Sequence, residues 1–130
     1  MKYMLLIYHD EKDWTGMSEA ERQEIYGEYR QLIGELSSRG HYLAGDQLQL
    51  AATASSVRVR GGKQMVTDGP FAETREQIGG FFMIEANDLE QATSIAARIP
   101  SARKGVIEVR PVVEESAGRQ TEIQIKEWFT

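Results

Sequence analysis

Cysteine is absent from this sequence of 130 residues, and proline occurs only three times. Without cysteine the chain forms no disulfide, no thiolate zinc site and no cysteine nucleophile. Long apolar runs are missing too, because the longest covers residues 3–8, whereas a membrane-spanning helix needs about 20 apolar residues. We therefore expect a cytoplasmic protein without a membrane partner.

An excess of basic residues is missing as well. Fifteen Lys and Arg residues stand against 20 Asp and Glu residues, which gives a net charge of −5. Nucleic-acid-binding proteins take much of their affinity from clustered Lys and Arg, so we expect no nucleic-acid partner. The composition does support a packed core, since 41% of the residues are hydrophobic, and the length suits one domain.

Two segments have the pattern of buried β-strands. Residues 2–8 and 80–86 are apolar at both odd and even positions, whereas a strand with one wet face alternates with polar residues. Residues 106–113 do alternate, as expected for a strand with one apolar and one polar face. Residues 57–60 and 63–67 flank Gly61 and Gly62 and predict a hairpin with a tight turn.

Two helices are indicated between these strands. Ser18 and Glu21 form a capping-box pattern at the start of the first helix, and Gly40 suits its end. Asn87 or Asp88 caps the second helix, and Pro100 ends it. Their apolar positions recur at helical spacing, namely Ile25, Tyr29, Leu32, Ile33 and Leu36 in the first and Leu89, Ala92, Ile95, Ala96 and Ile99 in the second.

The remaining segments have weaker patterns. We expect a polar stretch over residues 9–16, a turn at Gly45 and Asp46, and a short strand that includes Leu48 and Leu50. Residues 51–56 suggest a small-residue loop, and residues 68–77 a polar loop.

The order of elements predicts an α+β fold. The order β-α-β-β-α-β is that of the ferredoxin-like arrangement, an antiparallel sheet with two helices on one face. Two helices cover only one face, yet two of the predicted strands are apolar on both. A second copy of the chain is the simplest cover for the other face, so we expect a homodimer with a cavity between its two sheets.

Residues 66–81, which include Asp68-Gly69-Pro70-Phe71, closely resemble the DGPF-domain proteins of the YCII-related superfamily. The resemblance also covers residues 1–8 and 102–112. It implies a ferredoxin-like dimeric α/β barrel, with residues 1–113 as the YCII-related domain. Residues 114–130 lie beyond it, and their alternating Ile123 and Ile125 indicate an extra strand or a dimer arm.

The resemblance also has functional implications. Some members of the DGPF branch are linked to extracytoplasmic-function sigma factors, which implies such a functional link here. Other members of the superfamily resemble lyases or dehydrochlorinases that use a first-helix histidine near an aspartate on the following turn. This chain has Glu28 and Tyr29 in the corresponding region and no histidine between Ser18 and Gly40, so that dyad does not transfer.

Two residues are candidates for acid–base catalysis. His9 follows the first strand, and histidine titrates near neutral pH. Asp46 follows Gly45, where the superfamily's turn aspartate is expected. A surface histidine at a strand end is the alternative interpretation of His9, and His41, next to the helix end at Gly40, suits a capping role.

Six further residues are candidates for ligand binding. Asp68 and Phe71 form either a structural turn or the rim of a cavity. Arg75 can hold a carboxylate in two places, because its guanidinium is planar. The other three lie on predicted strands that face the cavity, namely Tyr8, Glu108 and Arg110, of which the last two could instead pair with each other.

No metal site or cofactor is indicated. The sequence has no phosphate-binding loop, no G-x-G-x-x-G stretch and no calcium loop, and its two histidines lie 32 positions apart. The favoured hypothesis is a homodimer that binds a small molecule in a regulatory or accessory role. The alternatives are a lyase or isomerase that uses His9 or Asp46 on an anionic or ring substrate, and an interaction module that uses the acidic loop or the tail.

Overall fold

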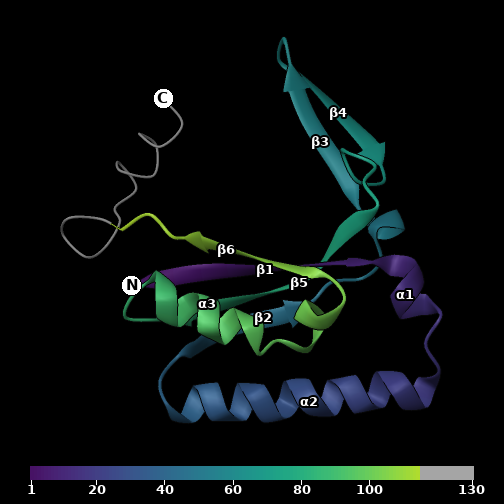
Figure 1. Cartoon of the computed structure of the whole chain (residues 1–130). Helices are drawn as coiled ribbons and strands as arrows, with labels where there is room; N and C mark the ends of the chain where they lie inside the picture. Colours follow the sequence, from purple (N-terminus) through teal and green to yellow (C-terminus); the bar gives the residue numbers. More distant parts are fainter. Residues whose placement is uncertain (115–130) are drawn as a thin grey trace.

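The main sheet of the computed structural model, which describes residues 1–114, has four antiparallel strands in the order β2-β5-β1-β6 (Figure 1). They are β1 (Lys2–Asp10), β2 (Tyr42–Gln47), β5 (Glu76–Glu85) and β6 (Val106–Pro111). Because β1 and β5 are the interior strands, each pairs with a neighbouring strand along both edges. This position explains why their sequences are apolar at odd and even positions alike.

Three helices belong to the described residues, namely α1 (Glu11–Thr15), α2 (Glu19–Ser38) and α3 (Leu89–Ala97). The predicted capping box is confirmed, since Glu21 N donates to Ser18 Oγ and Ser18 N donates to Glu21 Oε1. Gly40 follows the helix with a φ of +77°, a conformation that glycine adopts without strain. Asp88 caps α3, as predicted, by accepting from Gln91 N.

Helices α2 and α3 lie on the same face of the sheet (Figure 1). The core between them and the sheet contains side chains of every second residue along β1 and β5, and these contact apolar residues of both helices. The fully buried large side chains are Tyr3, Leu5, Leu36, Ile84 and Ile99. The described residues thus form a mixed α+β fold with antiparallel sheets, consistent with the predicted ferredoxin-like arrangement.

The opposite face of the sheet has no helix over it (Figure 1). The strand register places six large apolar side chains of β1 and β5 there, and each is partly exposed. They are Met4, Leu6, Tyr8, Ile78, Phe81 and Met83, and we call this surface the open face.

The predicted hairpin forms a separate two-stranded sheet from β3 (Ser55–Arg60) and β4 (Lys63–Asp68). Gly61 and Gly62 make its turn with φ angles of +57° and +75°, as the two adjacent glycines suggested. The hairpin rises from the sheet on the side away from α2 and α3 (Figure 1).

The middle of the chain differs from the sequence prediction. Gly45 and Asp46 lie within β2 instead of forming a turn, and Leu48 and Leu50 lie after it instead of forming a strand. A Cβ atom at Gly45 would lie 2.8 Å from the carbonyl oxygen of Phe81, so glycine here serves close pairing with β5.

Other boundaries also shift. The stretch predicted as polar between residues 9 and 16 contains α1, which Asp10 caps by accepting from Lys12 N. The expected loop over residues 51–56 contains a 3₁₀ turn, Ala51–Thr53, and the first residues of β3. Pro100 opens a second 3₁₀ turn, Pro100–Arg103, two residues after the C-cap of α3. The strand or arm expected in residues 114–130 falls, from residue 115 on, outside the described residues.

None of the helices in residues 1–114 combines the length and the hydrophobicity that a bilayer span requires.

Leu36 and Leu43 provide a matched test of this core. Leu36 is 1% exposed between α2 and the sheet, whereas Leu43 is 47% exposed. We expect Leu36→Ala to lower the free energy of unfolding by about 2–5 kcal/mol, because it leaves a cavity in a packed core. Leu43→Ala is expected to change it by about 0.5 kcal/mol or less. Urea denaturation of both variants measures this, and equal losses would contradict the packing described here.

Candidate functional site

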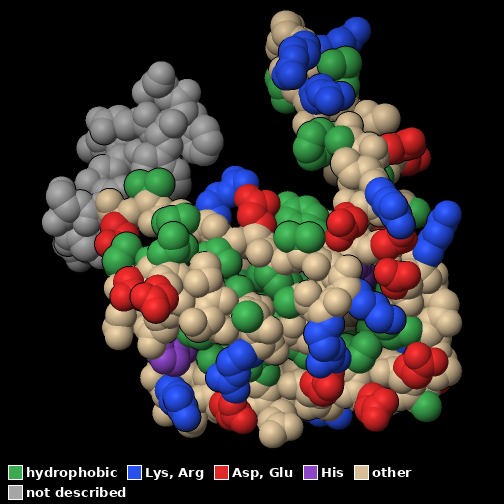
Figure 2. Space-filling view, in the orientation of Figure 1, with side chains coloured by type: hydrophobic (Ala, Val, Ile, Leu, Met, Phe, Trp, Pro, Cys, Tyr) green, Lys and Arg blue, Asp and Glu red, His purple; other side chains and the backbone are tan. Residues whose placement is uncertain are grey.

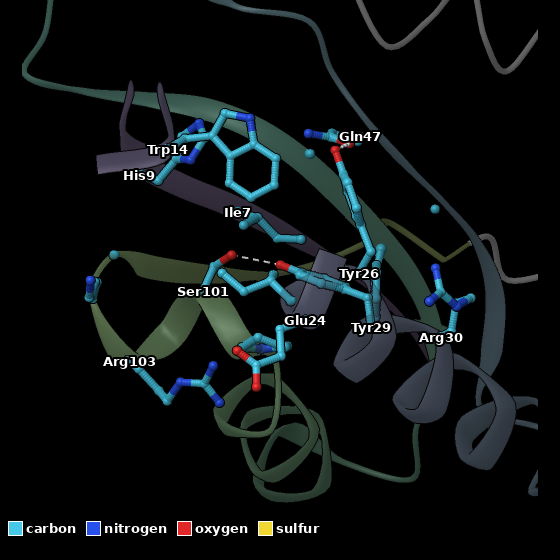
Figure 3. Close-up of a pocket in the computed structure, with 18 of the residues that line it drawn as sticks. Ile7, His9, Trp14, Glu24, Tyr26, Tyr29, Arg30, Gln47, Ser101 and Arg103 are labelled. Atoms are coloured by element: carbon cyan, nitrogen blue, oxygen red, sulfur yellow. Dashed lines mark hydrogen bonds between the residues drawn. The ribbon is translucent and has the colours of Figure 1, made fainter. Parts of the chain in front are cut away.

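A pocket of about 480 Å³ lies between the N-terminal half of α2 and the sheet (Figure 3). Side chains of β1, α1 and α2 form its walls together with the 3₁₀ turn Pro100–Arg103. The pocket is therefore on the helix side of the sheet, whereas the cavity predicted from the sequence would lie between two open faces.

Four glycines lie in the floor of this pocket. Gly45 of β2, Gly79 and Gly80 of β5, and Gly105 before β6 all border it. Under the C-terminal half of α2, the sheet instead presents large side chains such as Leu5 and Ile84 to the core. Interiors of proteins are close-packed, so a run of positions without side chains leaves space that the helix does not fill.

His9 lies on this floor. It follows Ile7 in strand alternation, so its side chain faces the helices, and it lines the pocket. A Cβ atom at Gly79 would lie 2.5 Å from Nε2 of His9 and 2.9 Å from Cδ2. The imidazole therefore rests directly against the backbone of β5, at the point where the β1–β5 register shifts.

Aromatic rings form much of the wall. The rings of Trp14 and Tyr26 meet edge to face, with 5.5 Å between centroids, and Tyr29 and Tyr42 pack in the same manner on Phe82. Arg22 holds Trp14 in place, because its guanidinium lies 5.9 Å from the indole centroid and donates to the Trp14 carbonyl oxygen. These contacts give the pocket rigid apolar surfaces.

Two hydrogen bonds cross the pocket region (Figure 3). Tyr29 Oη and Ser101 Oγ are 2.7 Å apart and join α2 to the 3₁₀ turn before β6. Tyr26 Oη donates to Gln47 Oε1 over 3.0 Å and joins α2 to β2. The two bonds fix the helix above the glycine floor, so they keep the pocket open.

The phenols beside the pocket stay protonated well into the alkaline range. Burial raises the pKa of Tyr29, and the hydrogen bond with Ser101 offsets only part of this effect. Burial, followed by the negative charge of Asp46, raises the pKa of Tyr42. Both groups act near neutral pH as hydrogen-bonding groups and not as bases.

Charged side chains of both signs surround the mouth. Arg103 binds Glu28 through two hydrogen bonds of 3.3 and 2.6 Å, which occupy its guanidinium. The other charged residues that border the pocket, apart from His9, are Asp13, Glu21, Glu24, Arg30, Asp46 and Lys104. With the Glu28–Arg103 pair neutral, these six residues give 2 − 4 = −2, so the residues around the mouth carry a small excess of negative charge.

The structure separates the two predicted catalytic residues. Both border the pocket, but Asp46 pairs with Phe81 in the β2–β5 register, and Phe81 belongs to the open face. The next residue, Gln47, reaches Tyr26 on the helix side, so strand alternation directs the Asp46 side chain the other way. The His9 and Asp46 side chains therefore lie on opposite faces of the sheet.

The predicted ligand-binding residues fall into two groups, neither of which borders the pocket. Tyr8, Glu108 and Arg110 lie on the open face, where Arg110 donates to the Glu108 carboxylate. The others lie near the hairpin.

Asp68 ends β4, and Phe71 after it is 82% exposed. Arg75 Nε lies 3.4 Å from Asp10 Oδ2, in an ion pair between two surface side chains.

Several residues of the pocket were not identified from the sequence. Trp14 lies in the stretch predicted as polar, and Ser101 follows the helix-ending proline. Tyr26 sits beside, not on, the predicted apolar stripe of α2. The adjacent glycines 79 and 80 inside an apolar strand were the available signal, since glycine within a strand marks a bulge or a close approach.

Comparison with known proteins assigns the chain to a family. A family model described as the YCII-related domain matches residues 1–116. The chain belongs to the YCII-related family. An uncharacterized protein of Rhizobium meliloti (strain 1021) is 31% identical to this YCII-related protein over 114 residues, which are 86% of this chain and 92% of that relative.

Gly79 and Gly34 test the contact beneath His9. Gly79→Ala places a methyl group within 2.5 Å of the imidazole, so we expect the ring to move and the His9 NMR signals to shift. A Cβ atom at Gly34 of α2 meets nothing within 4 Å. Gly34→Ala is therefore expected to leave the His9 signals unchanged and to stabilise the helix by up to about 1 kcal/mol. Unchanged His9 signals in Gly79→Ala would contradict this placement.

Proposed function

We propose that this YCII-related protein binds a small, partly apolar molecule in the pocket between α2 and the sheet. The observation that carries the proposal is the pocket itself, about 480 Å³ with aromatic walls above a glycine floor. Ligand sites typically enclose about 300–1,000 Å³ and combine apolar walls with a few polar groups. We assign the protein a regulatory or accessory role in the cytoplasm, without a specified reaction.

The walls favour a flat ligand of one or two rings. Trp14 and Tyr26 offer rigid aromatic surfaces, while His9 and Ser101 offer hydrogen-bonding groups within the same pocket. Because the residues around the mouth carry a small excess of negative charge, a neutral or zwitterionic ligand suits it better than a strongly anionic one.

The proposal includes a homodimer formed through the open face. Full burial of a large apolar side chain stabilises the protein by roughly 1.5–3 kcal/mol, and the open face carries six that remain partly exposed. The open face of a second copy would cover these side chains, in a dimer whose two subunits use the same surface. Tyr8, Glu108 and Arg110 would line any cavity between the two faces. The link to an extracytoplasmic-function sigma factor stays a prediction from the resemblance.

A lyase or isomerase is the second candidate. The observation in its favour is the imidazole of His9, a group that can donate or accept a proton, inside a pocket with apolar walls. Its partner in such chemistry would come from the ligand or from Ser101 and not from Asp46, whose side chain lies on the other face.

Filling the pocket tests ligand binding. Ile25 lines the pocket from α2, and Gln31 lies on the same helix outside it. We expect single-ring and two-ring aromatic compounds to raise the melting temperature of the wild type, because selective binding stabilises the folded state. Ile25→Trp should abolish the shift, and Gln31→Trp should retain it. A shift that survives Ile25→Trp would refute this site.

A His9→Ala variant separates the two candidates. If the protein only binds, the compounds found above remain chemically unchanged with wild type and variant, as measured by mass spectrometry. If it is an enzyme, the wild type forms a product, and we expect His9→Ala to slow turnover by about 10²–10⁴-fold, the usual share of a general acid or base. Turnover that is equal in both proteins would exclude His9 as the catalyst.

A further inference from the structure

The β3–β4 hairpin is poorly supported by the rest of the described chain. Its strands pair only with each other and do not extend the four-stranded sheet. Figure 1 shows it rising away from the helices, and Figure 2 shows it standing clear of the body of the molecule. Isolated two-stranded hairpins are at best marginally stable in water. We therefore expect this hairpin to be stabilised by contact with another molecule.

The two faces of the hairpin differ in chemistry. Val57 pairs directly with Val66, and Val59 lies on the same face two residues further along. These three side chains are 60%, 57% and 58% exposed, respectively, and we call them the valine face. The opposite face carries the cations, with Arg58 opposite Met65 and Arg60 opposite Lys63.

The base of the hairpin continues the apolar surface. Phe71 is 82% exposed and borders a shallow groove together with residues 55–58. Phe71 thus borders the same groove as Val57 of the valine face, and exposed apolar side chains that lie together are typical of an interface.

The direction in which the hairpin projects indicates which molecule it contacts. The hairpin rises on the same side of the sheet as the open face (Figure 1). A molecule seated on the open face would therefore lie beside the hairpin. If that molecule is a second copy, two-fold symmetry places each hairpin beside the other body.

The charge of the hairpin also favours a second copy as the partner. Residues 55–68 carry three cations and Asp68, which gives 3 − 1 = +2, so the rest of the chain carries −5 − 2 = −7. Figure 2 shows the Lys and Arg side chains gathered at the tip of the hairpin. A basic arm on an acidic body favours approach to another acidic body of the same kind.

We propose that the β3–β4 hairpin is a dimer arm that lays its valine face and Phe71 against the flank of a second copy. This inference rests on the proposed homodimer and adds a contact outside the open face. The arms are reciprocal, so the dimer contains two of these contacts.

A pair of neighbouring substitutions tests the arm without changing charge. Val66→Gln places a polar group on the valine face, and Thr67→Gln places the same group on the opposite face of the same strand. Both positions are exposed, so neither variant disturbs the core. Sedimentation equilibrium should give a dimer dissociation constant that is raised about tenfold or more by Val66→Gln and is changed less than about threefold by Thr67→Gln.

Removing the arm gives a second measurement. Gly69 N donates to Ala54 O over 2.7 Å, so the ends of the hairpin are adjacent and two glycines can replace residues 55–68. We expect this variant to dimerise more weakly than the wild type. Its melting-temperature shift with the aromatic compounds should persist, because the replaced residues do not line the pocket.

Leu6→Lys on the open face distinguishes the ways in which the inference fails. Leu6→Lys could dissociate the dimer while Val66→Gln and the hairpin replacement leave the dimer dissociation constant at its wild-type value. That result would refute the proposed arm contact and support the dimer through the open face. If the wild type is monomeric up to millimolar concentration, both the proposed dimer and the proposed arm contact are refuted. In either case, ligand binding in the pocket is tested separately by the melting-temperature shifts with the aromatic compounds.

Discussion

The packing of the C-terminal half of α2 on strands β1 and β5 is the contact on which the remaining structure depends. Leu32 and Leu36 bury their side chains there, against residues such as Leu5 and Ile84. A helix of 20 residues is about 30 Å long, so anchoring one half fixes where the other half must lie. That other half passes over glycines, and Tyr26 links it to the edge strand β2 through the hydrogen bond with Gln47. One well-packed contact thus produces both the core and the pocket beside it.

The elements predicted correctly from the sequence depend on neighbours along the chain. The capping box at Ser18, the glycine turn of the hairpin and the cap at Asp88 are each decided within a few residues. The order of the other strands and helices followed from the same local patterns, whereas α1 was missed and β2 was placed too far along the chain. Periodicity was sufficient for these features because no distant contact competes with them.

The elements that were predicted wrongly depend on contacts far apart in the sequence. Gly45 suggested a turn, but close pairing with β5 places it in a strand. The pocket was missed for a similar reason, since Gly79 and Gly105 become a floor only when α2 lies above them. Empty space is a property of the assembled layers, and a single stretch of sequence does not encode it. His9 could be identified as a candidate, whereas the residues around it could not.

The glycine floor also bears on which part of the proposed site would discriminate between ligands. Apart from His9, the glycine positions of the floor offer few side-chain atoms, so most of the selectivity would come from the roof formed by α1, α2 and the Ser101 turn. Exposed and half-buried positions on a helix tolerate replacement more readily than positions in a hydrogen-bonded sheet ladder. In the proposed ligand-binding role, substitutions in the roof would therefore change the preferred ligand while the sheet beneath stays the same.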